Sequence, residues 1–409
     1  MFFANIQGVM TTAGGILLAV FALLCMVVIH ELGHYTMGKI FKFKINEFAV
    51  GFGKPIFRKR KKNGEYVSLR MIPLGGYCEF AGEDEESAEP HAFNNHAPWK
   101  RLIVLFAGAF FNLVSAILII SLTFTFHGDV LPVTTPVYES AQTGALWAEK
   151  DIVFSVDGTR FSFFSSNIEG LFLTEGDHEV LVRRINAETG KREDVRFTVN
   201  SSNVNVIPYS NMRAYAFYKD HYLGLGKTRS GTDKDGNPTY YEYEASEFAN
   251  QTKGVLEENY NTVKAALEEG NCITYQYYRV TFNFFDAVGR SFTSTIDLVG
   301  VLLDSFAGMF TGKVSINEMG GPFTVITTMG KSVQYGVGNL MYYVCLISAN
   351  LAVFNLLPIP SLDGSRMLFT FIEWVRGKPV NRNVEGIIHF VGIIVLFAFA
   401  IFVDLIKLF

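Results

Sequence analysis

Four apolar stretches in this sequence are long enough to cross a lipid bilayer, which takes about 20 residues of helix. They run over residues 15–37, 102–126, 337–357 and 387–403. The chain of 409 residues is 49% hydrophobic but also 18% charged, so it cannot lie within a membrane throughout. We therefore expect an α-helical polytopic membrane protein, with about four transmembrane helices and folded parts outside the bilayer.

Lysine and arginine residues are concentrated in two of the connecting segments. Residues 39–101 contain twelve of them and residues 366–382 contain four, whereas residues 1–14 contain none. Because basic loops remain on the cytoplasmic side, both basic segments are predicted to be cytoplasmic, with residues 128–336 and both ends of the chain on the outer side. The net charge of -4 argues against nucleic acid as a partner, and the four scattered cysteines predict no disulfide framework.

The first apolar stretch contains the sequence His-Glu-Leu-Gly-His at residues 30–34. Ionisable groups at membrane depth cost about 2.5–3.5 kcal/mol each on insertion scales, so their presence there points to a function. Residues four apart lie on one face of a helix, so His30 and His34 can bind one metal ion, with Glu31 beside them to take a proton. Two solvated surface histidines are the alternative, which the apolar surroundings disfavour.

A third candidate ligand lies at the end of the third apolar stretch. The predicted topology brings Asp363 to the same membrane depth as the two histidines, and Pro358 and Pro360 interrupt the helix just before it. Two histidines, one aspartate and a water would give a tetrahedral zinc site with one open position, as catalytic zinc requires. Taken alone, Asp363 would more often be a turn or helix-cap residue before Gly364 than a metal ligand.

These motifs resemble the site-2 proteases, a family of intramembrane zinc metalloproteases, and in particular their bacterial branch, which acts in envelope signalling. The resemblance rests on residues 30–34, on the Asn-to-Gly segment 355–364, on Pro-Leu-Gly-Gly-Tyr at 73–77, and on a central insert between the second and third spans. It implies a protein of the cell (inner) membrane that cleaves a transmembrane helix of another protein. Such substrates include an anti-sigma factor already trimmed outside and a leftover signal peptide.

The resemblance also implies roles for individual residues. It implies that the Zn²⁺ ligands are His30, His34 and Asp363. It implies that the catalytic base is Glu31. It implies that four residues contact the substrate: Gly75, Gly76, Asn112 and Asn355.

The segment between the first two spans is predicted to form a small β-sheet. Residues 45–52, 56–60 and 66–72 have strand-like patterns, and Lys-Asn-Gly at 62–64 predicts a hairpin turn. By resemblance this is a membrane-associated β-hairpin sheet, and an unwound substrate could pair with its edge. Proline or charged substitutions in residues 67–72 should then reduce cleavage without loss of zinc. An ordinary cytosolic hairpin is the alternative.

The central region begins with features that are similar to a PDZ domain. A loop and a short helix near residues 144–146 precede a strand closed by Asp157-Gly158, and residues 178–185 and 194–199 read as further strands. Residues 282–310 repeat apolar side chains at helical spacing with interspersed charges, which favours an interfacial helix over a span. An inserted α+β PDZ-like domain on the extracytoplasmic side is therefore expected.

The predicted order of parts follows from these observations. It is a first membrane part with the β-loop and the second span (1–126), a PDZ-like domain (127–200), an unassigned extracytoplasmic extension (201–280), an interfacial helix with a linker (281–335), and a second membrane part (336–409).

Three functions are compatible with intramembrane histidines and an aspartate. A zinc metalloprotease uses all of the motif residues. A non-catalytic membrane scaffold that presents a PDZ domain would have no use for Glu31 beside its metal ligands. An ion transporter would usually show internal repeats, and the two halves of this sequence show none.

Overall fold

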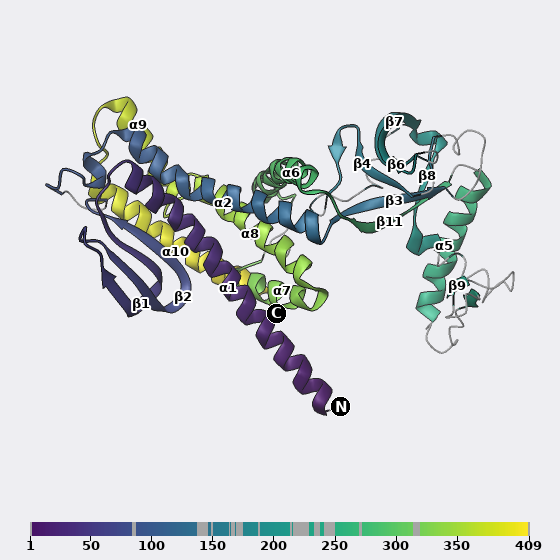
Figure 1. Ribbon diagram of the computed structural model, residues 1–409, viewed down its shortest axis with the longest axis horizontal. Coiled ribbons are helices and arrows are strands. Elements are labelled where there is room, and N and C mark those ends of the chain that lie inside the picture. The colour runs from purple at the N-terminus through teal and green to yellow at the C-terminus, as the bar shows by residue number, and fades with distance from the viewer. Residues whose placement is uncertain are drawn as a thin grey trace. The chain divides into compact units, whose positions relative to one another are not determined.

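The computed structural model describes most of the chain, and its elements are labelled in Figure 1. The described residues are 2–83, 87–136, 146–148, 150–162, 164, 168, 175–186, 189–212, 215, 229–232, 238–240, 250–269, 272–313 and 320–407. The chain divides into two compact units, one of residues 1–127 with 282–409 and the other of residues 128–281.

The first unit is mainly helical. Its helices are α1 (Phe2–Ile40), α2 (Pro98–Phe126), α6 (Phe284–Thr311), α7 (Pro322–Ser332), α8 (Val337–Leu356), α9 (Asp363–Arg376) and α10 (Arg382–Ile406). Local signals mark several of their ends. Pro98 is the first residue of α2, α8 ends just before Pro358, and α9 is closed by Gly377 in the left-handed conformation.

Five described helices are long and apolar enough to span a membrane. They contain the segments Ala13–Ile40, Pro98–Phe126, Phe284–Met309, Val337–Leu356 and Asn383–Ile406. Four of these overlap the four predicted stretches, and the additional one is α6, for which the sequence predicts an interfacial helix. Several apolar helices together with β-sheets make this a polytopic membrane protein.

Helix α6 contacts α2 through a small polar side chain and turns large apolar side chains outward. Ser291 is buried, and its hydroxyl oxygen is 2.7 Å from that of Ser121 in α2. In contrast, Phe285 and Phe292 are 84% and 55% exposed. Figure 1 shows α6 nearly end-on while α2 extends across the view, so the two helices cross instead of running side by side.

Helices α1, α2 and α8 approach one another closely. A Cβ atom added to Gly33 would lie 2.3 Å from the carbonyl oxygen of Ala107, so glycine is needed where α1 touches α2. On the other side of α2, the hydroxyl of Ser348 in α8 donates to the carbonyl of Asn112 at 2.8 Å. Small residues and side-chain hydrogen bonds of this kind hold helices together in a membrane, where the lipid is as apolar as the side chains.

A two-stranded antiparallel sheet follows α1. It consists of β1 (Ile45–Arg60) and β2 (Tyr66–Phe80), joined across the predicted turn at Gly64, which has a φ of 90°. The predicted strands 45–52, 56–60 and 66–72 are confirmed, and β2 extends further than predicted. Because both strands are long and bent, each pairs with the other in two separate segments.

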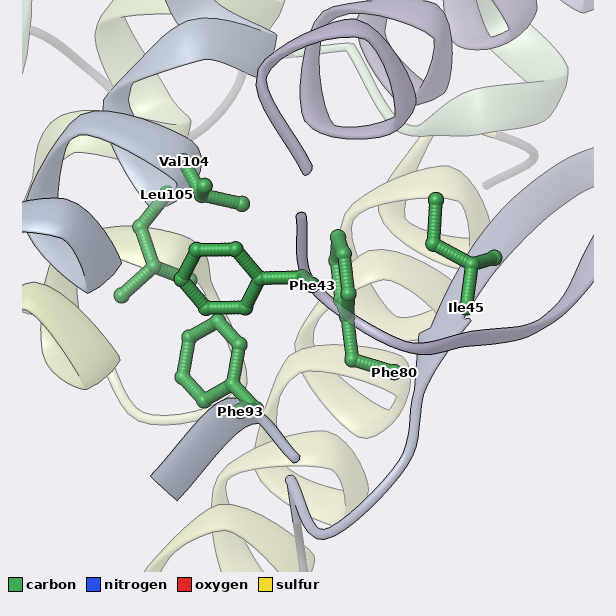
Figure 2. Packing of buried hydrophobic residues seen from close by; sticks show 6 residues of the cluster. All are labelled: Phe43, Ile45, Phe80, Phe93, Val104 and Leu105. Carbon is green, nitrogen blue, oxygen red and sulfur yellow. The ribbon is translucent and has the colours of Figure 1, made fainter. Parts of the chain in front are cut away.

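A buried hydrophobic cluster joins this sheet to α2. Its members are Phe43, Ile45, Phe80, Phe93, Val104 and Leu105. Figure 2 shows the three phenyl rings gathered together, with the two α2 side chains next to them. The ring centroids of Phe43, Phe80 and Phe93 lie 5.4 to 5.8 Å apart, in tilted and edge-on arrangements that aromatic pairs prefer. Packing in this cluster fixes the end of β2 beside the helix.

Glu65 attaches the start of β2 to the end of α1. Its buried carboxylate accepts hydrogen bonds from Tyr35 at 2.8 Å, from Asn63 at 2.7 Å and from Lys39, and it forms an ion pair with Lys61 at 2.6 Å. Burial opposes ionisation of Glu65, but the hydrogen bonds from Lys39, Lys61, Tyr35 and Asn63 outweigh it and lower the pKa of the carboxyl to about 2. The sheet is therefore held to α1 by an ionised carboxylate.

A second buried ion pair joins α2 to α9. Arg101 is 1% exposed, and its guanidinium is 2.5 Å from the carboxylate of Glu373. Leaving one partner of such a buried pair unmatched typically costs about 3–5 kcal/mol. The pair therefore holds α9, which begins at Asp363, in a defined position against α2.

The second unit contains a sheet with the strand order β7-β6-β4-β3-β11-β8, in which β5 pairs with β4. The strands are β3 (Asp129–Pro136), β4 (Asp151–Val156), β5 (Thr159–Arg160), β6 (Asp177–Ile185), β7 (Arg192–Asn200), β8 (Asn205–Pro208) and β11 (Cys272–Val280). Neighbours are antiparallel except β8 and β11. Helix α5 (Asn250–Glu269) contributes Val263 to a buried cluster with Ile207 and Cys272. Strands β9 (Arg229–Thr232) and β10 (Pro238–Tyr240) form a separate hairpin.

The strands predicted at 151–156, 178–185 and 194–199 are confirmed as β4, β6 and β7. The predicted turn is also present, with φ values of 50° at Asp157 and 77° at Gly158. Asp157 accepts a hydrogen bond from His178 at 2.6 Å, which lowers the pKa of its carboxyl. The helix predicted near 144–146 falls almost wholly outside the described residues. The sequence also predicts a flexible loop for the polar, glycine-containing stretch 227–238, most of which likewise lies outside the described residues.

Candidate active site

His30 and His34 lie near the end of α1, on the face that packs against α2. Both residues are buried, with exposures of 7% and 6%. Their rings meet edge to face at a centroid distance of 4.8 Å, as expected for residues one helical turn apart. A Cβ atom at Gly108 of α2 would lie 2.4 Å from Nε2 of His34 and 2.7 Å from Cε1 of His30, so glycine leaves the room that the two rings occupy.

Asp363 is brought to the histidines by a break between α8 and α9. Helix α8 ends at Leu356, and Ser361 adopts a positive φ of 82° in the turn that follows. A Cβ atom on Gly364 would lie 2.2 Å from the carbonyl oxygen of Leu357, so the chain folds back tightly on the end of α8. Asp363 is the first residue of α9, and its carboxylate points to the histidines.

Three potential ligand atoms converge at this point. Oδ2 of Asp363 is 3.0 Å from Nε2 of His30 and 3.3 Å from Nε2 of His34, and the two Nε2 atoms are 3.1 Å apart. Ligands on zinc at about 2.0–2.1 Å in a tetrahedron are about 3.3 Å from one another, so the triangle has the size of one face of a zinc site. Among the described residues, this is the group of His, Cys, Asp and Glu side chains that could hold a metal ion.

The hydrogen-bonding of His34 also suits a metal ligand. Its Nδ1 is 2.8 Å from the backbone carbonyl of Val104, which can only accept a hydrogen bond. The ring proton is therefore on Nδ1, and Nε2 carries the lone pair that faces Asp363 and His30. A carbonyl partner of this kind fixes both the tautomer and the orientation of a metal-binding histidine.

Glu31 lines a cavity of ≈ 260 Å³ together with His34 and Asp363. Its carboxylate accepts a hydrogen bond from the backbone N–H of Cys78 in β2. A carboxylate beside a metal site in a polar cavity can accept a proton from water and return it to a leaving group. The cavity also holds Tyr77 and Arg366, so strand β2 and helix α9 form part of its wall.

Cys78 lies next to Glu31 but is not suited to act as a nucleophile. Burial raises the pKa of the Cys78 thiol well above its usual range, and the negative charge of Glu31 adds to this effect. The thiol is therefore protonated at neutral pH. The groups that can react in the cavity are therefore the carboxylate of Glu31 and a water molecule.

One of the outer segments of the sheet lines this cavity. Residues 67–69 pair with β1 on both sides, with 48–50 and with 57–59. The expectation that 67–72 offers an edge for a substrate is therefore wrong for these three residues, whereas Arg70 and Ile72 each pair with one residue only. Residues 76–80 pair with β1 on one side, and no other described strand pairs with them. Residues 77–80 line the cavity. The sequence could not show which segment of β2 lies at the edge of the sheet, because the two strands pair with each other twice along their length.

An ion pair closes one side of the cavity. Arg366 of α9 binds the carboxylate of Glu83, whose other oxygen is 3.4 Å from the backbone N–H of Phe80. Both charged residues also line a second cavity of ≈ 250 Å³, which contains Arg101 and His389. Glu83 begins the acidic run 83–86, for which the sequence predicts only solvated side chains, and residues 84–86 lie outside the described part of the chain.

Of the four residues predicted to contact the substrate, the structure places three beside His30 or Glu31 and the fourth elsewhere. Nδ2 of Asn355 is 3.4 Å from Nε2 of His30, beside the ligand triangle, and Nδ2 of Asn112 is 3.4 Å from Nδ1 of the same ring. Gly76 lies near Glu31, since its Cβ would be 3.6 Å from Cγ of Glu31. Gly75 instead packs against the ring of Phe52 and is not brought to the metal-binding group.

Two residues of α2 that position the histidines are not among the residues predicted for the site. Gly108 provides space for both rings, and Val104 orients His34 through its backbone. Residues 104, 108 and 112 are spaced by four, which places them on one face of the helix. That spacing is the signal in the sequence that could have identified this face.

His389 is predicted to be a packed histidine of the last span, not a ligand. It is not part of the group formed by His30, His34 and Asp363, and its Nδ1 accepts a hydrogen bond from the backbone N–H of Ser361 at 3.1 Å. Its ring also meets Phe369 edge to face at 5.8 Å. The side chain thus joins α10 to the turn before Asp363.

Comparison with known proteins agrees with this arrangement. The sequence pattern of peptidase family M50 matches residues 18–399. The chain is 27% identical to a protein of Neisseria meningitidis, covering 90% of this chain and 93% of that protein, and 26% identical to one of Fusobacterium nucleatum, covering 96% and 99%. It is also 26% identical to a Vibrio cholerae protein, covering 95% and 98%. All three carry names that describe zinc metalloproteases.

The match of the family pattern extends over nearly the whole chain and includes His30, His34 and Asp363. The names of the relatives agree with the donor set, which is that of a catalytic zinc site. The chain therefore belongs to peptidase family M50, the site-2 proteases, and is a multi-pass membrane zinc metalloprotease.

Proposed function

We propose that His30, His34 and Asp363 hold the catalytic zinc and that the enzyme cleaves transmembrane segments of single-span membrane proteins. The observation that carries the proposal is the triangle of Nε2, Nε2 and Oδ2 atoms with sides of 3.0 to 3.3 Å, next to Glu31 in a polar cavity. Regulated intramembrane proteolysis of an anti-sigma factor, or removal of signal-peptide remnants, is the corresponding biological role.

Glu31 is the proposed general base and acid. Bound zinc supplies a Lewis acid that polarises the scissile carbonyl and lowers the pKa of water to about 7. Glu31 accepts the proton of the attacking water and then donates it to the nitrogen of the leaving amine. Asn355, beside Nε2 of His30, is placed to donate a hydrogen bond to the substrate backbone.

The outer segment of β2, residues 76–80, is the proposed docking edge for the substrate. A transmembrane helix hides its peptide bonds in its own hydrogen bonds, so it must unwind before hydrolysis. Unpaired backbone groups are costly within lipid, and a strand edge next to Glu31 can bind the unwound stretch. Support comes from the one-sided pairing of this segment and from its position in the wall of the cavity.

The proposed topology places the active site at the cytoplasmic side of the cell (inner) membrane and residues 128–281 outside the cytoplasm. The basic segments 39–101 and 366–382 support it, because both flank the end of the bundle that contains the site. We assign a PDZ-like fold to residues 127–200, with 201–280 as an extension that adds β8 and β11 to the same sheet. Helix α6 is assigned to the outer interface, as its crossing of α2 and its exposed apolar face suggest.

The substrate class can be tested with purified protein in lipid vesicles. A single-span protein with an apolar segment should be cleaved within that segment, as mapped by mass spectrometry. Cleavage should stop on treatment with a zinc chelator and return when zinc is added. The matched control is the same protein with its apolar segment replaced by a soluble, unfolded sequence of equal length. Equal cleavage of the control would contradict the proposed substrate class.

A cysteine at Glu79 allows a direct test of the docking edge, because this residue lies in the same segment, lines the cavity and is exposed, unlike the buried Cys78 thiol. With alanine at all four native cysteines and glutamine at Glu31, the introduced cysteine at position 79 is the only one in the chain. Single cysteines are then moved along the substrate segment and disulfide formation is measured. Pairing as a strand predicts crosslinks at every second position, because side chains alternate between the two faces of a strand.

The control for this test moves the cysteine from position 79 to Val67, which pairs on both sides. Crosslinking should then be low at every substrate position. With the cysteine at position 79, crosslinks that recur every three to four substrate residues would contradict docking as a strand, and so would equal crosslinking at every position.

A further inference from the structure

Asn112 faces the back of His30, away from the ligand triangle. It lies in α2, is 0% exposed, and its side-chain Nδ2 is 3.4 Å from Nδ1 of His30. Its Oδ1 is buried and has no hydrogen-bond partner among the described residues. A buried carbonyl oxygen without a partner costs about 1–3 kcal/mol, so a donor for this atom is to be expected nearby.

His30 supplies that donor. Its Nε2 faces His34 and Asp363, at 3.1 and 3.0 Å. A neutral imidazole has one nitrogen with a lone pair and one with a proton, so a His30 that uses Nε2 as a ligand carries its proton on Nδ1. Two donors, the Nδ1–H of His30 and the Nδ2 amide of Asn112, would then face each other.

A half-turn of the Asn112 amide resolves this conflict. It exchanges Oδ1 and Nδ2, which differ little in size, and it places the acceptor opposite the Nδ1–H group. We propose that Asn112 is a positioning residue, whose amide oxygen accepts the Nδ1–H hydrogen bond of His30 and holds Nε2 toward the zinc. The proposal rests on the ligand set of the proposed function.

The same helix face orients the other histidine. The Val104 carbonyl accepts the Nδ1–H hydrogen bond of His34 at 2.8 Å, and Gly108, halfway between Val104 and Asn112, leaves room for both rings. One stripe of α2 with a spacing of four residues therefore sets the tautomer and direction of both imidazoles. Asn112 lies behind His30 and is fully buried, so it does not reach the substrate, in contrast to the role implied by the family resemblance.

Two substitutions distinguish the effect of the acceptor oxygen from the effect of side-chain size. Asn112→Leu keeps the size of the side chain and removes the acceptor, whereas Asn112→Asp keeps an acceptor oxygen. Loss of such a partner of a metal ligand typically weakens metal binding about 10- to 100-fold, so Asn112→Leu should show a loss of this size and Asn112→Asp should remain within a few-fold of wild type. Zinc affinity is measured by competition with a chromophoric chelator in detergent-solubilised full-length protein.

The visible spectrum of the Co²⁺-substituted protein provides a second readout that does not depend on activity. Asn112→Leu should change the ligand-field bands, and Asn112→Asp should leave their positions near those of wild type. A variant that fails to fold is recognised by size-exclusion chromatography. If Asn112→Leu fails to fold, the zinc affinity and spectrum of Asn112→Asp test the proposal: values near wild type support it, and a large loss of zinc affinity contradicts it. Wild-type zinc affinity and spectrum in Asn112→Leu would overturn the proposal, and so would an equal loss of affinity in both variants.

His34→Ala separates failure of this inference from failure of the ligand set. If the ligands are correct and the Asn112 inference is wrong, His34→Ala loses zinc while Asn112→Leu retains it. If the ligand set itself is wrong, His34→Ala retains zinc at wild-type affinity, and both proposals fall together.

Discussion

Glu31→Gln is expected to retain zinc and to lower kcat by about 10²–10⁴-fold, the usual contribution of a general base. Glutamine has nearly the shape of glutamate but cannot accept a proton from water. The three proposed ligand atoms belong to other residues, so the metal should stay bound. The measurement combines zinc content of the purified protein with cleavage of a single-span substrate followed over time.

The matched control for this variant is Glu179→Gln, an equivalent change at an exposed residue of the other unit whose side chain is 59% exposed. It should retain both zinc and wild-type cleavage. A wild-type rate in Glu31→Gln would rule out the proposed base, and loss of zinc from that variant would show that Glu31 is itself needed for metal binding.

Gly108→Ala is expected to abolish zinc binding at the site or weaken it by more than 100-fold. The new Cβ atom would lie 2.4 Å from Nε2 of His34, so the ring must leave the position in which it faces Asp363. Alanine is the better helix former by about 1 kcal/mol, so α2 itself should not be destabilised by the exchange. Zinc content by mass spectrometry, together with thermal unfolding, measures the two effects separately.

Gly289→Ala is the matched control, because Gly289 is also in a helix and has no atom within 4 Å of the added Cβ. It should keep its zinc and its unfolding temperature within a few degrees of wild type. Normal zinc content in Gly108→Ala would mean that the histidines bind metal in a different arrangement from the one described.

The metal-binding group was predictable because its signals are local and chemically specific. Two histidines four residues apart on an apolar helix leave few alternatives, and the break before Asp363 brings a carboxylate to the same membrane depth. The structure brings these three side chains together as predicted. Their role as zinc ligands is what the proposed variants test.

The surroundings of the site were harder to predict, because they depend on contacts between distant parts of the chain. The sequence predicts an edge at residues 67–72, but residues 67–69 pair on both sides, and residues 76–80 form an outer segment of the sheet. A strand pattern shows which residues are extended but not how often a bent strand pairs. Similarly, the spacing of residues 104, 108 and 112 indicates one helix face, but only the packing of α2 against α1 shows that this face orients the histidines.

Composition alone does not decide whether helix α6 spans the membrane or lies at its surface. Its length and hydropathy fit a membrane span, while its charged residues favour the interface. The feature that distinguishes these options is its direction relative to α2, which is a property of the fold and not of the sequence. The same applies to residues 201–280, whose strands β8 and β11 complete a sheet begun by β3 and β4.

His30 and Asp363 are 333 residues apart in the chain, yet they meet at one point. On the proposed ligand set, a polypeptide still attached to its ribosome has both imidazoles and Glu31 in the membrane long before the carboxylate ligand has been synthesised. The unfinished product therefore lacks a complete zinc site and cannot hydrolyse the nascent membrane proteins around it. Hydrolytic competence then begins only once α9 has been made and has docked.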